Sequence, residues 1–157
     1  MNESIAKKIG EVLAFNRVGS DTIEKSRATL VTALGEEALS DMEEKFKIHG
    51  EEVLRIATEA GVVDVVLAKA DKTETKLKQM RDLYIGEKWD DATEIMEWSG
   101  FFFGAHIVHW AFVRGAAEGS NDQNMLLISE EGINWNYEML ETCESELESR
   151  GQDKATA

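Results

Sequence analysis

Residues 95–113 read IMEWSGFFFGAHIVHWAFV, and Glu97 is the only charged residue among them. The length approaches the roughly 20 apolar residues that a membrane-spanning helix needs. Glu97, His106 and His109 would be costly inside a bilayer, however. A helix that is apolar on all sides otherwise belongs in a protein core. The stretch therefore predicts an all-α fold, a helical bundle around a central aromatic, apolar helix over about 91–118, and no membrane span.

The same helix carries a stripe of small residues. They recur at steps of four, seven and four, which at about 100° per residue keeps them on one narrow side of the helix: Gly100, Gly104, Ala111 and Gly115. Small residues at such positions let another helix approach closely, so we expect a helix-packing seam. Packing inside one chain is the preferred interpretation, and contact with a second copy in a homodimer is the alternative. Under the preferred interpretation, Gly104→Leu should destabilise the fold by overpacking.

Toward the N-terminus, apolar spacing predicts a helix that begins near Ser4 and ends at Gly19. Residues 21–24, Asp-Thr-Ile-Glu, have the form of a capping box, so a second helix is expected to begin there. It is expected to run to Gly50, with an interruption at Gly35 or at Ser40 left open.

At Gly50 we expect a hairpin rather than one long helix, because glycine inside a helix costs about 1 kcal/mol relative to alanine. The apolar positions of residues 53–70 alternate steps of three and four, which is typical of a helix that packs against long antiparallel neighbours. The following segment, up to Gly86, either starts afresh at Asp71 or continues the same helix with a bend.

Beyond the aromatic helix, itself introduced by a capping box at residues 91–94, residues 120–124 are polar and predict a loop. The last helix is expected to follow Ser129 and to end before Gly151. The chain should therefore form about five or six helices, with one domain over 1–150 and a mobile polar tail over 151–157.

Composition agrees with this fold class. The 157 residues contain no proline, which would interrupt helices. The single cysteine, Cys143, cannot form a disulfide within the chain, so the fold depends on packing and suits a reducing compartment such as the cytoplasm. The first residues, Met-Asn-Glu-Ser, show no basic and apolar run typical of a secretory signal.

The net charge of −14 disfavours direct binding to nucleic acid and favours a cationic partner. Residues 118–157 hold ten acidic and two basic side chains. We expect a non-catalytic regulatory protein that binds another protein, with a basic surface on the partner, as a nucleic-acid mimic would. The expected binding residues are Glu138, Glu141, Glu144 and Glu148. The competing interpretation is an ordinary solvated helix face.

Catalytic motifs are missing from the sequence. It contains no glycine-rich phosphate loop, no paired CxxC, no HExxH and no nucleophile elbow, and the glutamates around Cys143 should keep its thiol unreactive. No cofactor is expected on this hypothesis. The alternative is a metal- or haem-binding bundle that uses His106 and His109, which lie three residues apart on one side of a helix. Neither histidine follows a glutamate at the spacing of di-iron carboxylate bundles, which counts against that kind of centre.

Overall fold

The computed structural model describes all 157 residues and contains five α-helices and no strand, which confirms the all-α bundle. The helices are α1 (Glu3–Leu34), α2 (Glu36–Glu59), α3 (Val63–Ile85), α4 (Ala92–Ser120) and α5 (Gln123–Thr156). None of them combines the length and the apolar character that crossing a membrane requires.

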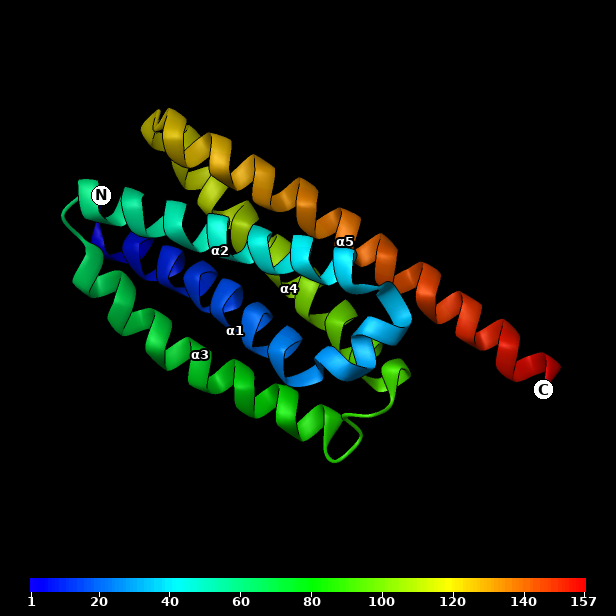
Figure 1. Cartoon of the computed structure of the whole chain (residues 1–157). Coiled ribbons are helices and arrows are strands. Elements are labelled where there is room, and N and C mark those ends of the chain that lie inside the picture. The colour runs from blue at the N-terminus through cyan, green and yellow to red at the C-terminus, as the bar shows by residue number, and fades with distance from the viewer.

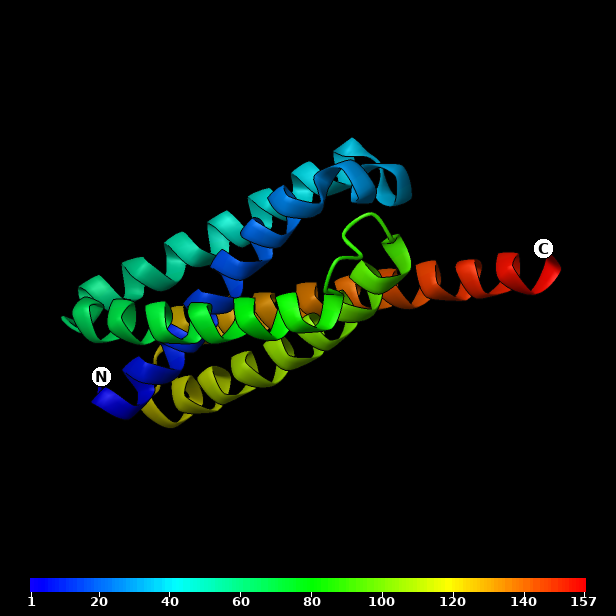
Figure 2. The same ribbon diagram turned by 90° about the horizontal axis from the view of Figure 1, so that it is seen from below.

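The centre of the bundle is α1, not the aromatic helix α4. Helix α1 packs against α2, α3 and α4, and α4 in turn forms an antiparallel hairpin with α5 (Figure 1). In Figure 2, α4 runs along one edge of the molecule with no helix outside it. Accordingly α1 contributes 15 buried residues and α4 contributes 11. Helix α4 supplies aromatic mass to the core from one side only.

The predicted helix end at Gly19 is wrong, because α1 continues through this glycine, whose small size allows close packing against α2. A Cβ atom on Gly19 would lie 2.3 Å from Cζ of Phe46, so the missing side chain makes room for the phenyl ring of α2. Asp21 is inside α1 and caps no helix. Its carboxylate instead accepts a hydrogen bond from Arg81 of α3 at 2.6 Å.

The predicted hairpin at Gly50 is also wrong, and the chain turns at Gly35 and Gly61. Both turning glycines have positive φ, 85° and 68°, a region that other residues rarely adopt. Gly50 lies within α2, where the Leu13 methyl group approaches its Cβ position only to 3.7 Å. The predicted helix over residues 53–70 is divided by the turn at Gly61, so its first part belongs to α2. No new helix starts at Asp71, and α3 ends before Gly86 as predicted.

The N-cap of α4 is confirmed, since the backbone N–H of Thr93 donates to Asp91 at 2.9 Å. Helix α5 begins earlier than predicted. Asp122 caps it by accepting from the N–H of Met125 at 3.0 Å, so Ser129 lies inside the helix. Helix α5 also continues through Gly151, and residues 151–156, expected as a tail, form its exposed last turns.

The glycines of the small-residue stripe of α4 have no neighbouring helix against them, whereas Ala111 is partly buried against the core. Side chains added at Gly100, Gly104 or Gly115 would meet nothing within 4 Å. The stripe is therefore not a seam between helices of one chain, which corrects the preferred interpretation. The expected destabilisation of a single chain by Gly104→Leu loses its physical reason. Contact between two copies stays a prediction.

Candidate functional site

An exposed apolar surface covers the outer sides of α3 and α4, and we call it the apolar face. Its most exposed side chains are Leu83, at 86% exposure, Phe101, at 63%, and Val108, at 62%. Large apolar side chains with such exposure are individually ordinary on a protein surface, but several together are not. The face comprises Met80, Leu83 and Tyr84 from α3 and Phe101, Val108 and Phe112 from α4.

A groove of about 710 Å³ between α3 and α4 forms one part of the apolar face, and all nine residues that line it are hydrophobic. Buried rings of Trp98 and Phe102 form its base. The rings of Tyr84 and Phe101 lie 5.3 Å apart across it. The Tyr84 hydroxyl donates to Glu97 at 3.0 Å, so the polar tip of the tyrosine is satisfied at the edge of the groove.

The face arises because α4 is apolar around its whole circumference while only one side of it is covered. Phe102, His106 and Trp110 point into the bundle and are buried. Phe101 and Val108 occupy the opposite side and remain exposed. Sequence reasoning missed this surface because it assigned both sides of α4 to the core. On α3, Met80 and Leu83 are exposed beside them.

His106 lies in the core without a hydrogen-bond partner. Its ring is fully buried and stacks on Phe15 at 4.9 Å and on Trp110 at 5.8 Å, and neither ring nitrogen is paired. Burial lowers the pKa of His106 well below its usual value, and the nearby His49 and His109 lower it further. The ring is therefore neutral near pH 7 and packs as an aromatic group.

His109 points to a different partner. Its Nδ1 donates to the backbone carbonyl of Ala105 at 2.7 Å, and its Nε2 lies 3.4 Å from a carboxylate oxygen of Glu11. Burial would raise the pKa of Glu11, but hydrogen bonds from Lys8 and Lys69 lower it. Glu11 is thus a charged acceptor at the bundle edge. Glu11 forms ion pairs with Lys8 of α1 and Lys69 of α3, and it does not share a site with His106.

The histidines do not converge on a metal site. His49, of α2, is buried with its Nε2 3.4 Å from Glu131, whereas His109 contacts Glu11. No group of three or more His, Cys, Asp or Glu side chains is placed so that it could hold a metal ion. The geometry thus adds no support for metal or haem binding by His106 and His109, which stays a prediction.

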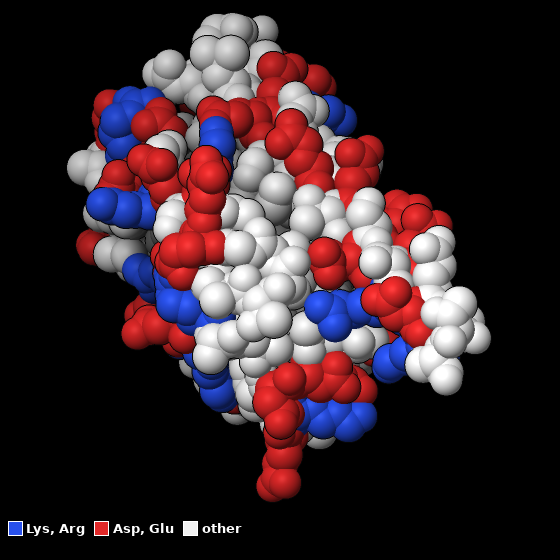
Figure 3. Space-filling model, turned by 45° about the vertical axis from the view of Figure 1, so that its right-hand side comes forward, with Lys and Arg blue, Asp and Glu red and all other residues white.

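The C-terminal end of α5 projects beyond the other helices (Figure 1). Of the four glutamates singled out from the sequence, Glu138 lies beside α2, and the other three follow it along α5 toward that end. All four, Glu138, Glu141, Glu144 and Glu148, are exposed, and none forms an ion pair within the chain. In Figure 3, acidic side chains lie all around an uncharged central area of the visible face, with basic ones between them. The structure therefore leaves these carboxylates free but does not set them in a uniquely acidic region.

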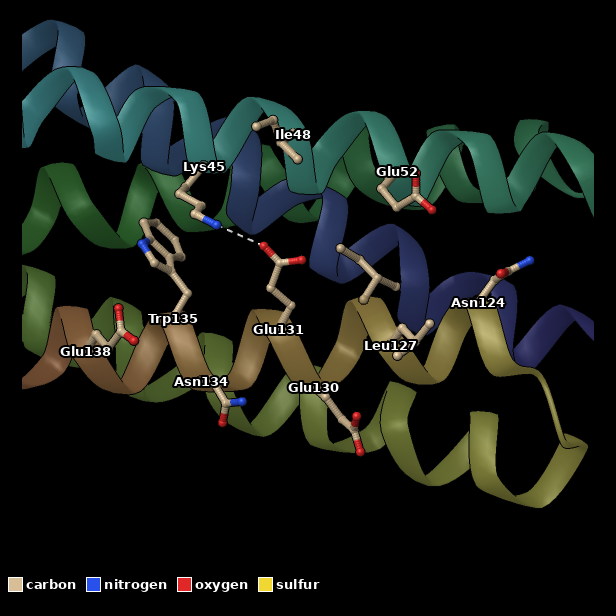
Figure 4. A pocket seen from close by; sticks show the side chains of 11 residues that line it. Lys45, Ile48, Glu52, Asn124, Leu127, Glu130, Glu131, Asn134, Trp135 and Glu138 are labelled. Carbon is tan, nitrogen blue, oxygen red and sulfur yellow. Dashed lines mark hydrogen bonds and ion pairs between the residues drawn. The ribbon is translucent and has the colours of Figure 1, made fainter.

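A second groove of about 710 Å³ lies between α2 and α5 (Figure 4). Lys45 of α2 reaches across it to Glu131 of α5 at 2.9 Å. Glu138 lines the end of this groove, and the buried indole of Trp135 lies beneath it. Because acidic side chains outnumber its one lysine, the groove suits cationic rather than anionic groups.

Together these features define a five-helix bundle with one uncovered apolar face and an acidic, partly projecting C-terminal helix. The chain matches no protein-family model, and it shows no significant similarity to a curated protein or a solved structure. Its function is accordingly inferred from the geometry of these surfaces.

Proposed function

We propose that this chain is a non-catalytic interaction protein that binds another protein through the apolar face. The observation that carries the proposal is the joint exposure of six large apolar side chains on α3 and α4. An aromatic residue alone carries roughly 150–250 Å² of surface. At the exposures of Leu83, Phe101 and Val108 the face amounts to several hundred Å², which is the size range of functional patches.

The composition of the face also supports a protein partner. Aromatic residues and methionine are enriched at protein interfaces, whereas charged residues are depleted at their centres. Tyr84 combines a half-exposed ring with a hydroxyl held by Glu97, which is the arrangement of a residue at the edge between an apolar centre and a polar rim.

Site-specific photo-crosslinking tests the proposal. A crosslinking residue in place of Leu83 should give a defined protein adduct in cells, because Leu83 is the most exposed apolar side chain. The Phe101→Asp substitution should remove that adduct. A crosslinker at the exposed Asp64 of α3 is the control, since Asp64 lies outside the face. Equal labelling from both positions, or labelling that survives Phe101→Asp, would exclude the apolar face as the binding surface.

A second candidate is recognition of a basic protein surface by the C-terminal half of α5. Its support is the set of exposed, unpaired glutamates at positions 138, 141, 144 and 148. Changing all four to glutamine should release basic partners that the wild type retains at low salt, because such attraction is electrostatic and screened. Identical partners for both proteins would contradict it.

We also propose a reducing compartment such as the cytoplasm. Cys143 is free and buried, and burial raises the pKa of its thiol to about 11, so the thiolate that reacts in disulfide exchange is scarce.

A further inference from the structure

We infer that the partner of the apolar face is a second copy of this chain, with the two α4 helices packed antiparallel around a two-fold axis at the level of His106. The inference rests on the proposed function and names its partner. A two-fold interface uses the same patch on both copies, so the patch must be complementary to itself. The outward side of α4 meets this condition in shape and in charge.

The outward side of α4 consists of two neighbouring stripes. At 100° per residue, the bulky residues Phe101, Val108 and Phe112 follow one line, and the small residues Gly100, Gly104 and Ala111 follow a second line beside it. The bulky stripe borders α3 and α1, because Tyr84 contacts Phe101 and the Lys8 ammonium lies 5.7 Å from the Phe112 ring. The small stripe lies on the other flank, toward α5.

An antiparallel two-fold arrangement brings like stripes together. It reverses the chain direction, so residues at nearly equal distances before and after His106 face each other. Phe101 then meets Phe112 of the second copy, which gives an aromatic contact on each side of the axis. Gly100 meets Ala111 of the second copy, so the two backbones can approach closely along the small stripe.

Charges at the two ends of the face favour the same arrangement. Glu97 and Arg114 bound the uncharged stretch of α4 at nearly equal distances from His106. Arg114 has no ion pair within its own chain, and Glu97 accepts a hydrogen bond only from the hydroxyl of Tyr84. The antiparallel packing places Glu97 of each copy at the same level as Arg114 of the other, whose long side chain projects from the flank of the small stripe, about 100° round the helix from Glu97. A parallel packing would instead oppose Glu97 to Glu97.

The available area is consistent with a dimer. A standard stable interface covers about 800 Å² on each partner. The exposed parts of the apolar face approach this value once Met80 and Leu83 of α3, exposed by 52% and 86%, join the α4 side chains. Helix α4 lies at an edge of the bundle with no helix outside it, so a second copy can reach it (Figure 2).

Sedimentation equilibrium of the full chain tests the dimer. We expect a mass of twice 17.6 kDa for the wild type. Phe101→Asp and Gly104→Leu should each weaken association at least tenfold while circular dichroism shows folded monomers. Leu127→Asp and Gly151→Leu are the matched controls, because both positions are exposed on α5, outside the two stripes, and they should remain dimeric.

A charge exchange tests the direction of packing. Glu97→Arg and Arg114→Glu should each weaken the dimer, and the double variant should recover it. Failure of the double variant to recover would overturn the antiparallel arrangement. A monomeric wild type, or a dimer indifferent to Phe101→Asp and Gly104→Leu, would overturn the inference altogether. In that case a crosslink from position 83 to a different protein would still uphold the proposed function.

Discussion

His106 occupies the core at an energetic cost that depends on pH. Both of its ring nitrogens are buried without a partner, and burial keeps its pKa well below 6.5. His49 is shifted in the same direction by burial, against the opposing effect of Glu131. In the unfolded chain both imidazoles become protonated near their ordinary pKa. In the folded chain they become protonated only at lower pH.

We therefore expect stability to be constant above about pH 7 and to fall as the pH drops below 6.5, because the unfolded state then binds more protons. Each such histidine contributes up to about 1.4 kcal/mol per pH unit. Urea denaturation between pH 7.5 and 5.0 measures the slope, and His106→Leu should reduce it. Carboxylates such as Glu131 lose their own contribution only below their usual value of 4.5. An unchanged slope in the variant would show that His106 is not the sensitive group.

Gly132 lies in tight contact with the indole ring of Trp110. A Cβ atom there would lie 2.4 Å from Cε2 of Trp110, a rigid ring that is itself fully buried. Gly132→Ala should destabilise the protein by about 1–3 kcal/mol, because overpacking forces neighbours to move. Gly119→Ala, in open space on α4, should be neutral or slightly stabilising. Equal midpoints in chemical denaturation would contradict the tight contact at Trp110.

Glycines also show what the sequence can predict. Gly86 ends a helix as predicted, and Gly19 does not, although both follow a regular apolar pattern. The difference comes from Phe46, whose ring fills the space beside Gly19. Such a contact between distant positions is invisible to local periodicity. Local signals succeeded where the chemistry is local, as at the Asp91 cap, while Asp122 was overlooked within a polar run.

Helices α1 and α3 are joined by one buried cation. Arg81 of α3 is 2% exposed and donates to Asp21 at 2.6 Å and to Thr22 at 3.0 Å, both on α1. Its guanidinium also lies 5.2 Å from the ring of Trp89. Because this cation has been removed from water, its partners on α1 are needed to offset the cost of burial.

Arg81→Met should therefore destabilise the protein by about 3 kcal/mol, since it breaks a buried pair and removes the hydrogen bonds to α1. Arg55→Met is the control. Arg55 pairs with Glu52 and Glu59 on the exposed side of α2, where such pairs contribute about 0–1 kcal/mol. Urea unfolding of both variants compares them. A loss in Arg81→Met no greater than in Arg55→Met would mean that apolar packing alone holds α3.

Element positions were harder to predict than element types. The absence of proline and the three-and-four spacing indicated helices throughout, and the structure is helical throughout. The sequence could not tell that α1 rather than α4 lies at the centre. Both helices are rich in apolar residues, and α4 is the more apolar. The outer side of α4 is exposed because α1 and α5 cover only the opposite side of this helix.

The whole molecule carries a net charge of −14, and its acidic side chains lie all around an uncharged central area of the visible surface (Figure 3). Their mutual repulsion favours expanded states of the chain. We expect the melting temperature to rise as sodium chloride increases from about 10 mM to 150 mM, because the screening length shortens from about 30 Å to 8 Å. Differential scanning calorimetry measures this. A falling melting temperature would mean that the surface ion pairs outweigh the repulsion.

The connections between the helices have a consequence for how quickly the native state is reached. Each joins two helices over six residues or fewer, and most helices pack against a neighbour in sequence. Local topology of this kind favours fast folding. The chain also lacks prolines, whose isomerisation takes tens of seconds. Stopped-flow refolding should therefore be complete without a phase in that time range, and a slow phase independent of protein concentration would contradict this expectation.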